Sequence, residues 1–201
     1  MIKVLLADDQ ALVRGALAAL LSLEDDLEVV AEVSRGDEVV AAAERTAPDV
    51  AVLDVEMPGL DGIAACAALR AARPGCRVLV VTTFGRPGYL RRAMEAGASG
   101  FMVKDAPAEQ LAEAIRRVRA GLRVVDPVLA AETLAAGDSP LTPREREVLL
   151  AARTGGTVAD VARELVLSEG TVRNYLSAAI GKTGARTRAE AVLLAEQRGW
   201  L

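Results

Sequence analysis

DVAVLDV, at residues 49–55, is a short run rich in Val and Leu that carries a carboxylate, Asp54, near its end. Three similar runs occur along the chain: IKVLLADD (2–9), RVLVVTT (77–83) and SGFMVKD (99–105). Such runs are typical of strands that are buried on both faces of a parallel sheet. The polar residues that close the four runs are Asp8 and Asp9, Asp54, Thr82 and Lys104.

The segments between these runs have the apolar spacing of amphipathic helices. Leu17, Leu20 and Leu21 show it in one segment, and Leu111 and Ile115 in another. Alternating strands and helices predict an α/β fold with a doubly wound, open parallel sheet. In such a sheet the polar groups at the carboxyl ends of the strands meet in a crevice at the topological switch point. We therefore expect the polar residues that close the four runs to converge.

The types of these residues predict a phosphoryl-accepting site. Neighbouring carboxylates repel one another unless a cation takes up their charge, and Mg²⁺ suits oxygen ligands. A carboxylate beside Mg²⁺ can attack a phosphoryl group and become an aspartyl phosphate. We expect Asp54 to be the nucleophile and Asp8 and Asp9 to hold the metal directly or through water. Thr82 would donate a hydrogen bond to a phosphoryl oxygen, and Lys104 would pair with Asp54 or with the phosphoryl group.

Residues 1–122 resemble the receiver domain of two-component response regulators, which has a CheY-like, flavodoxin-like fold. The resemblance rests on the acidic pair, DVEMPGLDG (54–62), the Thr pair at 82–83 and GASGFMVKD (97–105). It implies a five-stranded parallel sheet and a role for the Glu56 backbone carbonyl as a Mg²⁺ ligand. It also implies that Phe101, at a place often held by Tyr, turns inward as Thr82 moves toward the phosphoryl group.

Composition narrows the class of protein. The chain has 201 residues, and 52% of them are hydrophobic, which is enough for one receiver-sized domain and a smaller one. The two Cys residues are too few for a metal cluster, and the absence of His excludes imidazole catalysis and any phosphohistidine within the chain. No membrane-length apolar run or signal peptide is evident, so we expect a cytoplasmic protein that does not insert into membranes.

Residues 121–140, GLRVVDPVLAAETLAAGDSP, have Gly, Pro, Asp and Ser near the ends of an Ala-rich stretch. This composition is typical of a tether, here with a short helix inside it. The sequence thus predicts a first domain at 1–122, a linker at 123–139 and a second domain at 140–201. Residues 141–201 carry nine cationic and seven acidic side chains, a net charge of +2 on an acidic protein.

The second domain is predicted to be all-α, with four helices. Thr142, a segment near 157–165, Ser168 and Thr187 mark their starts, and Pro143 suits a first helical position. In the third helix, an apolar stripe leaves Arg173, Asn174 and Ser177 on the opposite face, as in the second helix of a helix-turn-helix. Arg and Asn can read bases in a major groove. Contacts to the phosphates are expected from Thr171, Lys182, Arg186 and Arg188.

Residues 141–192 resemble the LuxR-type helix-turn-helix, and a receiver joined to this module is the arrangement of the NarL/FixJ class. SEGTVRNYLS (168–177) is most similar to the DesR-like branch of that class. The resemblance implies a transcription factor that is not an enzyme, with a sensor histidine kinase, double-stranded DNA and a second copy of the chain as partners. In related regulators the first and fifth receiver helices often form the dimer face, to which Ala18, Leu21 and residues 115–119 would contribute here.

Several other classes of protein are compatible with part of the pattern. A haloacid-dehalogenase-like phosphohydrolase is disfavoured because Asp54 is not followed by its D-x-D-x-T/V motif, and an NTPase because no P-loop motif occurs. A quorum-sensing regulator would have no use for the acidic strand ends. A helical docking domain remains an alternative for residues 140–201. The main competing hypothesis is a phosphorylation-independent DNA-binding protein that uses the receiver only to dimerise.

Overall fold

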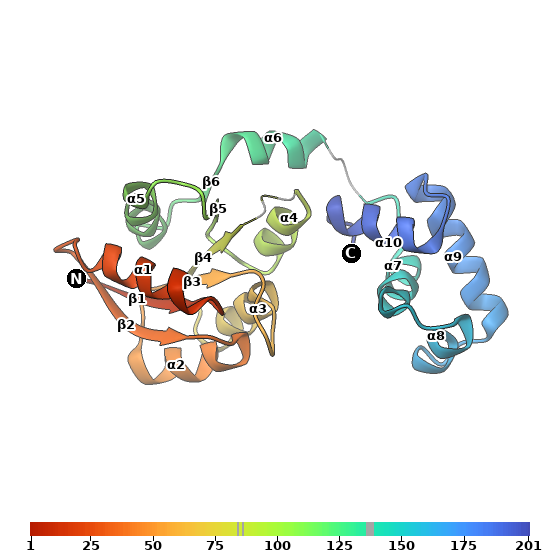
Figure 1. Ribbon diagram of the computed structural model, residues 1–201, viewed down its shortest axis with the longest axis horizontal. Helices are drawn as coiled ribbons and strands as arrows, with labels where there is room; N and C mark the ends of the chain where they lie inside the picture. The colour runs from red at the N-terminus through yellow and green to blue at the C-terminus, as the bar shows by residue number, and fades with distance from the viewer. Residues whose placement is uncertain (84, 86, 136–138) are drawn as a thin grey trace. The chain divides into compact units, whose positions relative to one another are not determined.

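The computed structural model describes residues 1–83, 85, 87–135 and 139–201 (Figure 1). The chain divides into two compact units. The first is formed by Met1–Gly85 and Tyr89–Ala130, and the second contains Ala131–Leu201. Each unit has a hydrophobic core of its own.

A parallel sheet forms the centre of the first unit. In the described part of the chain it has six strands in the order β2-β1-β3-β4-β5-β6, and all adjacent pairs are parallel. The strands are β1 (Ile2–Ala7), β2 (Leu27–Val33), β3 (Val50–Asp54), β4 (Arg77–Thr82), β5 (Gly100–Val103) and β6 (Val124–Val125). The predicted doubly wound α/β fold is confirmed, and its switch point lies between β1 and β3.

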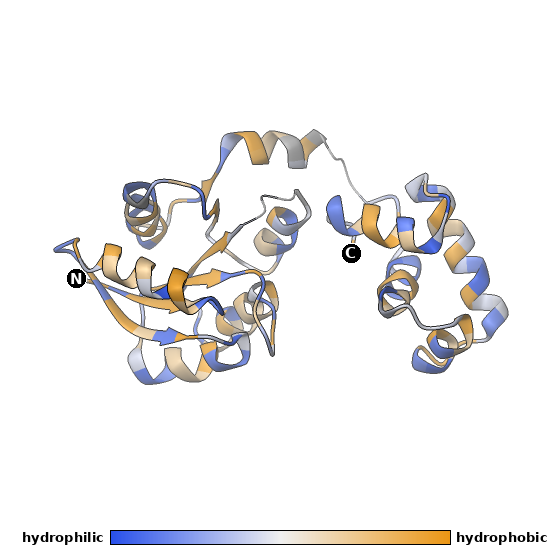
Figure 2. Cartoon of the chain, viewed as in Figure 1, coloured by the Kyte–Doolittle hydropathy of each residue, from blue (hydrophilic) through white to orange (hydrophobic). Residues whose placement is uncertain are grey.

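Helices cover both faces of this sheet. They are α1 (Ala11–Leu21), α2 (Val39–Thr46), α3 (Gly62–Ala72), α4 (Pro87–Glu95) and α5 (Ala108–Arg119), with a 3₁₀ turn at Gly36–Glu38. Neighbouring residues of β1 point to opposite faces, as expected for a strand. Leu5 packs with residues of α2 and α3, whereas Leu6 packs with residues of α1 and α5. Figure 2 shows mainly hydrophobic residues along the central strands.

The sheet has one strand more than the five expected. The additional strand, β6, lies within the segment predicted as a linker, and it pairs with β5 so that Val124 is opposite Gly100 and Val125 opposite Phe101. Two β-branched residues suit a strand, and β5 would otherwise leave an unpaired edge. The first unit therefore extends past residue 122, and residues 136–138 of the expected linker lie outside the described residues.

Helix α6 (Pro127–Ala135) follows β6 directly. Asp126 starts it, because its Oδ1 accepts hydrogen bonds from the backbone N–H groups of Val128 (2.8 Å) and Leu129 (3.0 Å). Leu129 is buried in the same core cluster as Phe101. The chain that leads to the second unit thus begins as part of the receiver-like core.

The second unit contains the four helices expected from the sequence. They are α7 (Pro143–Ala151), α8 (Val158–Glu164), α9 (Glu169–Thr183) and α10 (Arg188–Gln197). Each begins after a hydroxyl residue whose side chain accepts a hydrogen bond from the third backbone N–H of the helix; these residues are Thr142, Thr157, Ser168 and Thr187. The predicted starts at Thr142, Ser168 and Thr187 are confirmed.

The turn between α8 and α9 contains an unusual backbone conformation. Val166 has φ of 54°, in the left-handed region, and its side chain is 90% exposed. A β-branched residue is strained there because its Cβ crowds the backbone. The core of this unit includes Val172, Leu176 and Trp200, the only Trp of the chain.

The described helices include no segment of the length and apolar character needed to cross a membrane.

Candidate functional site

The carboxyl ends of β1, β3, β4 and β5 bring polar side chains to one edge of the sheet. Asp8 follows β1, while Asp54 and Thr82 are the last residues of β3 and β4, and all three are almost completely buried. Lys104 follows β5, and its backbone N–H donates to the carbonyl oxygen of Thr82 (2.8 Å). Parallel strands of this order therefore assemble residues that are up to 96 positions apart in the sequence.

Lys104 joins two of the carboxylates. Its Nζ lies 2.7 Å from Asp8 Oδ2 and 3.0 Å from Asp54 Oδ2, and both Asp side chains are only 3% exposed. The single ammonium group thus compensates two buried negative charges. A buried charge without a partner would be strongly destabilising.

Burial and hydrogen bonding together shift the pKa values of Asp54 and Lys104. Burial raises the pKa of Asp54 above its ordinary value, and the hydrogen bond and charge of Lys104 offset that rise only in part. For Lys104, burial acts to lower the pKa, but the hydrogen bonds to Asp8 and Asp54 outweigh it, so the pKa of the ammonium is raised. The lysine is therefore held in its charged form.

Three carboxylates at this edge suit a hard divalent cation. One oxygen each of Asp8, Asp9 and Asp54 can be chosen so that all lie within 4.8 Å of one another. Asp9 is exposed while the other two are buried, so the group opens to solvent on one side. An all-oxygen donor set with room for water is what Mg²⁺ prefers. Glu56, expected to contribute its backbone carbonyl, is exposed two residues after Asp54.

Two glycines allow close packing around the loop after Asp54. A Cβ on Gly62 would lie 1.8 Å from the backbone oxygen of Asp54, and one on Gly36 would lie 2.0 Å from the backbone oxygen of Leu60. Asp61 caps α3, since its Oδ1 accepts from the Ala64 N–H (2.7 Å). These close contacts hold the loop against the end of β3, where Asp54 lies.

Two residues that the sequence analysis did not single out hold Asp8. The Gln10 N–H donates to Asp8 Oδ1 (2.9 Å), and Arg14 Nη1 donates to the Asp8 backbone oxygen (2.6 Å). Both belong to the start of α1, directly after the acidic pair. Phe101, the expected switch residue, is completely buried in the core beside Leu129.

Helix α9 presents a polar face opposite its core side. Val172, Leu176 and Ala179 are buried, whereas Arg173, Asn174 and Ser177, the residues expected to read bases, are exposed. Arg173 Nη2 pairs with Glu169 Oε2 (2.6 Å) one turn earlier. Such exposed helix pairs are weak, so the guanidinium is available to a stronger partner.

The expected phosphate contacts differ in their surroundings. Thr171 Oγ1 lies 2.8 Å from the Ser168 hydroxyl, and the Arg186 side chain is exposed. Arg188 Nη1 donates to the Gly156 carbonyl (2.7 Å). These three residues lie at or near the first turns of α9 and α10.

Lys182 has a structural partner within the second unit. Its Nζ lies 2.8 Å from Oε2 of Glu145, which is buried and also accepts from the Thr142 N–H (2.7 Å). Burial acts to raise the pKa of Glu145, but the hydrogen bonds from Lys182 and Thr142 hold it below its ordinary value. This pair ties the start of α7 to the end of α9, and no local sequence pattern indicates it because 37 positions separate the two residues.

Three of the residues expected at the dimer face are core residues. Leu21 and Ile115, which were assigned to it, are buried in the core of the first unit, as is Val118. Arg116 binds Asp26 and Glu24, and Arg119 binds Asp49 (3.0 Å). Ala18 is partly exposed, and Arg117 and Arg119 are exposed, so the rest of the expected face stays a prediction.

Two family models match the chain. The model described as "Response regulator receiver domain" matches residues 4–116, and "Bacterial regulatory proteins, luxR family" matches residues 139–195. Together they cover the acidic strand ends and the helices α7 to α9.

Similar proteins span the whole chain. The transcriptional regulatory protein DesR of Bacillus subtilis is 42% identical over 200 residues, covering 100% of this chain and 99% of DesR. The uncharacterised transcriptional regulatory protein YvfU of the same organism is 42% identical over 203 residues, covering 100% of both. A crystal structure of the response regulator ChrA, from a heme-sensing two-component system, superposes with a TM-score of 0.59 at 34% identity, covering 100% of this chain and 98% of ChrA.

Proposed function

Because the chain belongs to the two-component response regulators that join a receiver domain to a LuxR-type DNA-binding domain, we propose that phosphorylation of Asp54 controls its binding to DNA. Proteins of this family are transcription factors, not enzymes, and work with histidine kinases. The observation that carries the proposal is the Lys104 ammonium between two buried carboxylates at the strand ends.

We propose that a partner histidine kinase supplies the phosphoryl group, because this chain contains no His that could carry it. A carboxylate oxygen of Asp54 attacks phosphorus while the P–N bond of a kinase phosphohistidine breaks, and the released imidazole takes up a proton. Asp8, Asp9, Asp54 and the Glu56 carbonyl would hold Mg²⁺, which neutralises charge on the phosphoryl oxygens when bound. Lys104 already lies where it can pair with the phosphoryl group, and Thr82 closes the neighbouring strand.

The transferred group carries about two negative charges at neutral pH and replaces the single charge of the Asp54 carboxylate, beside the Lys104 ammonium. We infer that Thr82 and Phe101 then rearrange. Phe101 lies opposite Val125 in the β5–β6 ladder, and Leu129 of α6 packs in the same cluster. A change at Phe101 therefore reaches the segment that leads to the DNA-binding domain.

We further propose that α9 enters the major groove of double-stranded DNA in the cytoplasm. Arg173, Asn174 and Ser177 would contact bases, with Thr171, Arg186 and Arg188 on phosphates. For Lys182 the pairing with Glu145 favours a positioning role beside any phosphate contact. Two chains joined as a dimer would read two half-sites, because the second site is then bound at a raised effective concentration.

Intact mass after incubation with acetyl phosphate and Mg²⁺ tests the acceptor. The native chain should gain one labile phosphoryl group and Asp54→Asn none, and the oligomeric state is followed on the same samples. Equal DNA affinity of Asp54→Asn and the phosphorylated native chain would instead favour the phosphorylation-independent regulator. A phosphorylation-independent regulator would have no function for the two buried carboxylates of Asp8 and Asp54, which repel each other.

DNA recognition is tested by selection of bound sequences from a random pool. Arg173→Ala and Asn174→Ala should each relax the preference at one position of the selected site, by about 1–3 kcal/mol. Arg163→Ala is the matched control, because Arg163 is an exposed arginine of α8 that pairs with Asp160 of its own helix. An unchanged preference in both α9 variants would exclude this face as the reader.

A further inference from the structure

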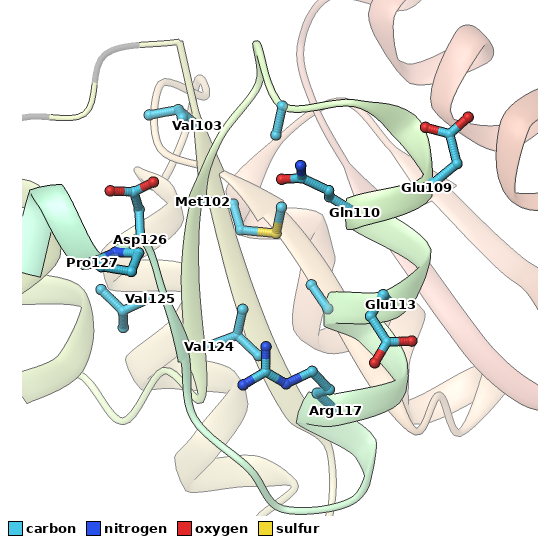
Figure 3. A pocket seen from close by; sticks show the side chains of 12 residues that line it. Met102, Val103, Glu109, Gln110, Glu113, Arg117, Val124, Val125, Asp126 and Pro127 are labelled. Atoms are coloured by element: carbon cyan, nitrogen blue, oxygen red, sulfur yellow. The ribbon is translucent and has the colours of Figure 1, made fainter.

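The phosphoryl-accepting site has different surroundings on its two sides. On the side of β5, a groove of about 390 Å³ lies between α5 and the strands β5 and β6 (Figure 3). Met102 and Val103 line this groove and directly precede Lys104 in the chain, so the segment that carries the lysine borders open space. On the side of β1, the Arg14 guanidinium is hydrogen-bonded to the segment that carries the acidic pair.

Arg14 lies early in α1 and bridges the helix, the acidic pair and the neighbouring strand. Its Nη1 donates to the Asp8 backbone oxygen (2.6 Å). Its Nε lies 3.6 Å from Oε2 of Glu32, a residue of β2. The Arg14 side chain is only 19% exposed. The guanidinium is therefore held between a helix and a strand and is largely shielded from solvent.

The hydrogen bond from Arg14 also bears on Asp9. The Asp8 carbonyl and the Asp9 N–H belong to one planar peptide unit, so a donor on that carbonyl limits the direction in which the Asp9 side chain leaves the backbone. This limit matters because Asp9 is exposed, whereas Asp8 is buried. A buried carbonyl that lost its donor would turn toward another partner or toward water, and the peptide would turn with it.

The Asp8 side chain is held from two other directions. The Gln10 N–H donates to Oδ1 (2.9 Å), and Lys104 Nζ lies 2.7 Å from Oδ2. A carboxylate has about four lone-pair sites, so these two contacts leave it able to bind a cation as well. Because Arg14 uses the backbone oxygen instead, it holds Asp8 without occupying a ligand atom of the side chain.

We propose that Arg14 is a positioning residue of the Mg²⁺ site, and that its hydrogen bond to the Asp8 carbonyl directs Asp9 toward the ion. The inference rests on the Mg²⁺ site of the proposed function. Hydrogen-bonded neighbours of metal ligands orient those ligands, and their loss commonly weakens metal binding about 10–100-fold. Arg14 is such a neighbour, because it touches the peptide that joins two of the three carboxylates.

The direction of the effect separates positioning from simple electrostatics. The guanidinium is a positive charge near the carboxylates, so removal of the charge alone would strengthen the binding of a divalent cation. Loss of the orientation of Asp9 would weaken it. Arg14→Met keeps an apolar stem but has neither the charge nor the N–H groups, so the two explanations predict opposite changes in metal affinity.

Binding of Mn²⁺ to the full-length chain tests the inference, because Mn²⁺ prefers the same oxygen ligands as Mg²⁺. The free ion is followed by electron paramagnetic resonance, with Mg²⁺ as a competitor, and thermal unfolding in EDTA records the stability of each variant. Arg14→Gln keeps N–H donors on a shorter side chain and lacks the charge. Arg70→Met is the matched control, since Arg70 is a half-buried arginine of α3 that donates to the Cys76 backbone oxygen (2.8 Å).

We expect Arg14→Met to weaken Mn²⁺ binding about tenfold or more and Arg14→Gln to lie between it and the native chain. Arg70→Met should lower the unfolding temperature in EDTA and leave the affinity for Mn²⁺ unchanged. Native or tighter binding by Arg14→Met overturns the inference, and so does an equal loss of affinity in Arg70→Met.

Should Arg14→Met not fold, Arg14→Gln decides alone, and native or tighter binding of Mn²⁺ by that variant overturns the inference. A native chain that binds no Mn²⁺ overturns the Mg²⁺ site of the proposed function together with the role of Arg14. The two failures are distinguishable, because binding by the native chain that does not depend on Arg14 overturns the positioning role alone.

Discussion

The strand-end site takes Asp8, Asp54 and Lys104 from distant segments and buries them, whereas the α9 face takes Arg173, Asn174 and Ser177 from two turns of one helix and leaves them exposed. In the first region every charge depends on the others, since Lys104 balances two carboxylates at once. In the second, the three side chains are exposed, and Arg173 pairs with Glu169 of the same helix and not with the other two. Substitutions should therefore act together in the receiver domain and separately on the DNA-binding face.

The largest expected difference in stability is between Ala substitutions at the two ion-paired lysines, Lys104 and Lys182. Lys104→Ala leaves two buried carboxylates without a counter-charge, so the free energy of unfolding of the receiver domain should fall by about 3–5 kcal/mol in EDTA, with partial recovery in Mg²⁺. Lys182→Ala should lower that of the DNA-binding domain by only about 1–2 kcal/mol. Lys182 is 38% exposed, and Glu145 keeps its hydrogen bond from the Thr142 N–H.

Urea unfolding followed by circular dichroism and by the fluorescence of Trp200 separates the two domains, because the single Trp lies in the core of the second. If both lysine substitutions lowered the free energy of unfolding equally, the difference in burial between the two ion pairs would not matter for stability.

Substitution of Ala at two glycines should change the free energy of unfolding in opposite directions. Gly62→Ala places a methyl group 1.8 Å from the Asp54 backbone oxygen, so it should destabilise the receiver domain by about 2–3 kcal/mol and displace the acceptor. Gly181→Ala, in an exposed position of α9 with no atom within 4 Å, should stabilise the DNA-binding domain by about 0.5–1 kcal/mol. Thermal unfolding of both variants shows whether each is stabilised or destabilised. A stabilised Gly62→Ala variant would contradict the close packing of the loop after Asp54.

The raised pKa of Asp54 should make the stability of the receiver domain depend on pH. Because its pKa is raised in the folded state, folding is favoured at low pH and loses stability as the pH rises from the ordinary carboxyl pKa through the raised one. Asp54→Asn removes this loss. In EDTA the stabilisation by Asn should therefore grow with pH across that window and stay constant above it.

Thermal unfolding of the receiver domain at a series of pH values measures this gain. A gain that shrinks with pH would mean that the Lys104 pairing dominates over burial. The DNA-binding domain serves as the internal control, since its unfolding should not depend on residue 54.

The smallest expected effect is at the turn before α9. Val166 is 90% exposed with φ of 54°, a conformation that Asn tolerates better than a β-branched residue. Val166→Asn should stabilise the DNA-binding domain by about 0.5–1 kcal/mol, measured through Trp200 fluorescence in urea. Val166→Ala lacks the short polar side chain that lets Asn adopt the left-handed region and should gain less, so an equal gain in both variants would trace the effect to lost exposed apolar surface.

The sequence predicted most of what depends on local pattern. Val- and Leu-rich runs gave β1, β3, β4 and β5, and hydroxyl residues before apolar stripes gave the starts of α7, α9 and α10. Strand order then brings Asp8, Asp54 and Lys104 together, because the ends of parallel strands share one edge of a sheet.

What the sequence did not reveal depends on contacts between distant residues. Val124 and Val125 were assigned to a linker, because two residues are too few to show strand periodicity and only the open edge of β5 makes them a strand. The Lys182–Glu145 pair left no local signal either. The resemblance that pointed to α1 and α5 as a dimer face could not show that Leu21 and Ile115 are used in the core, because their burial depends on contacts with the sheet.

The position of β6 also bears on how the protein is made. Strand β5 ends at Val103, but the strand that covers its edge lies at Val124–Val125, after the whole of α5. During synthesis the receiver domain therefore has an open strand edge while more than twenty further residues are added. If translation pauses within this interval, all the phosphoryl-accepting residues have been translated. The edge of β5 is still uncovered at that point and is prone to aggregation.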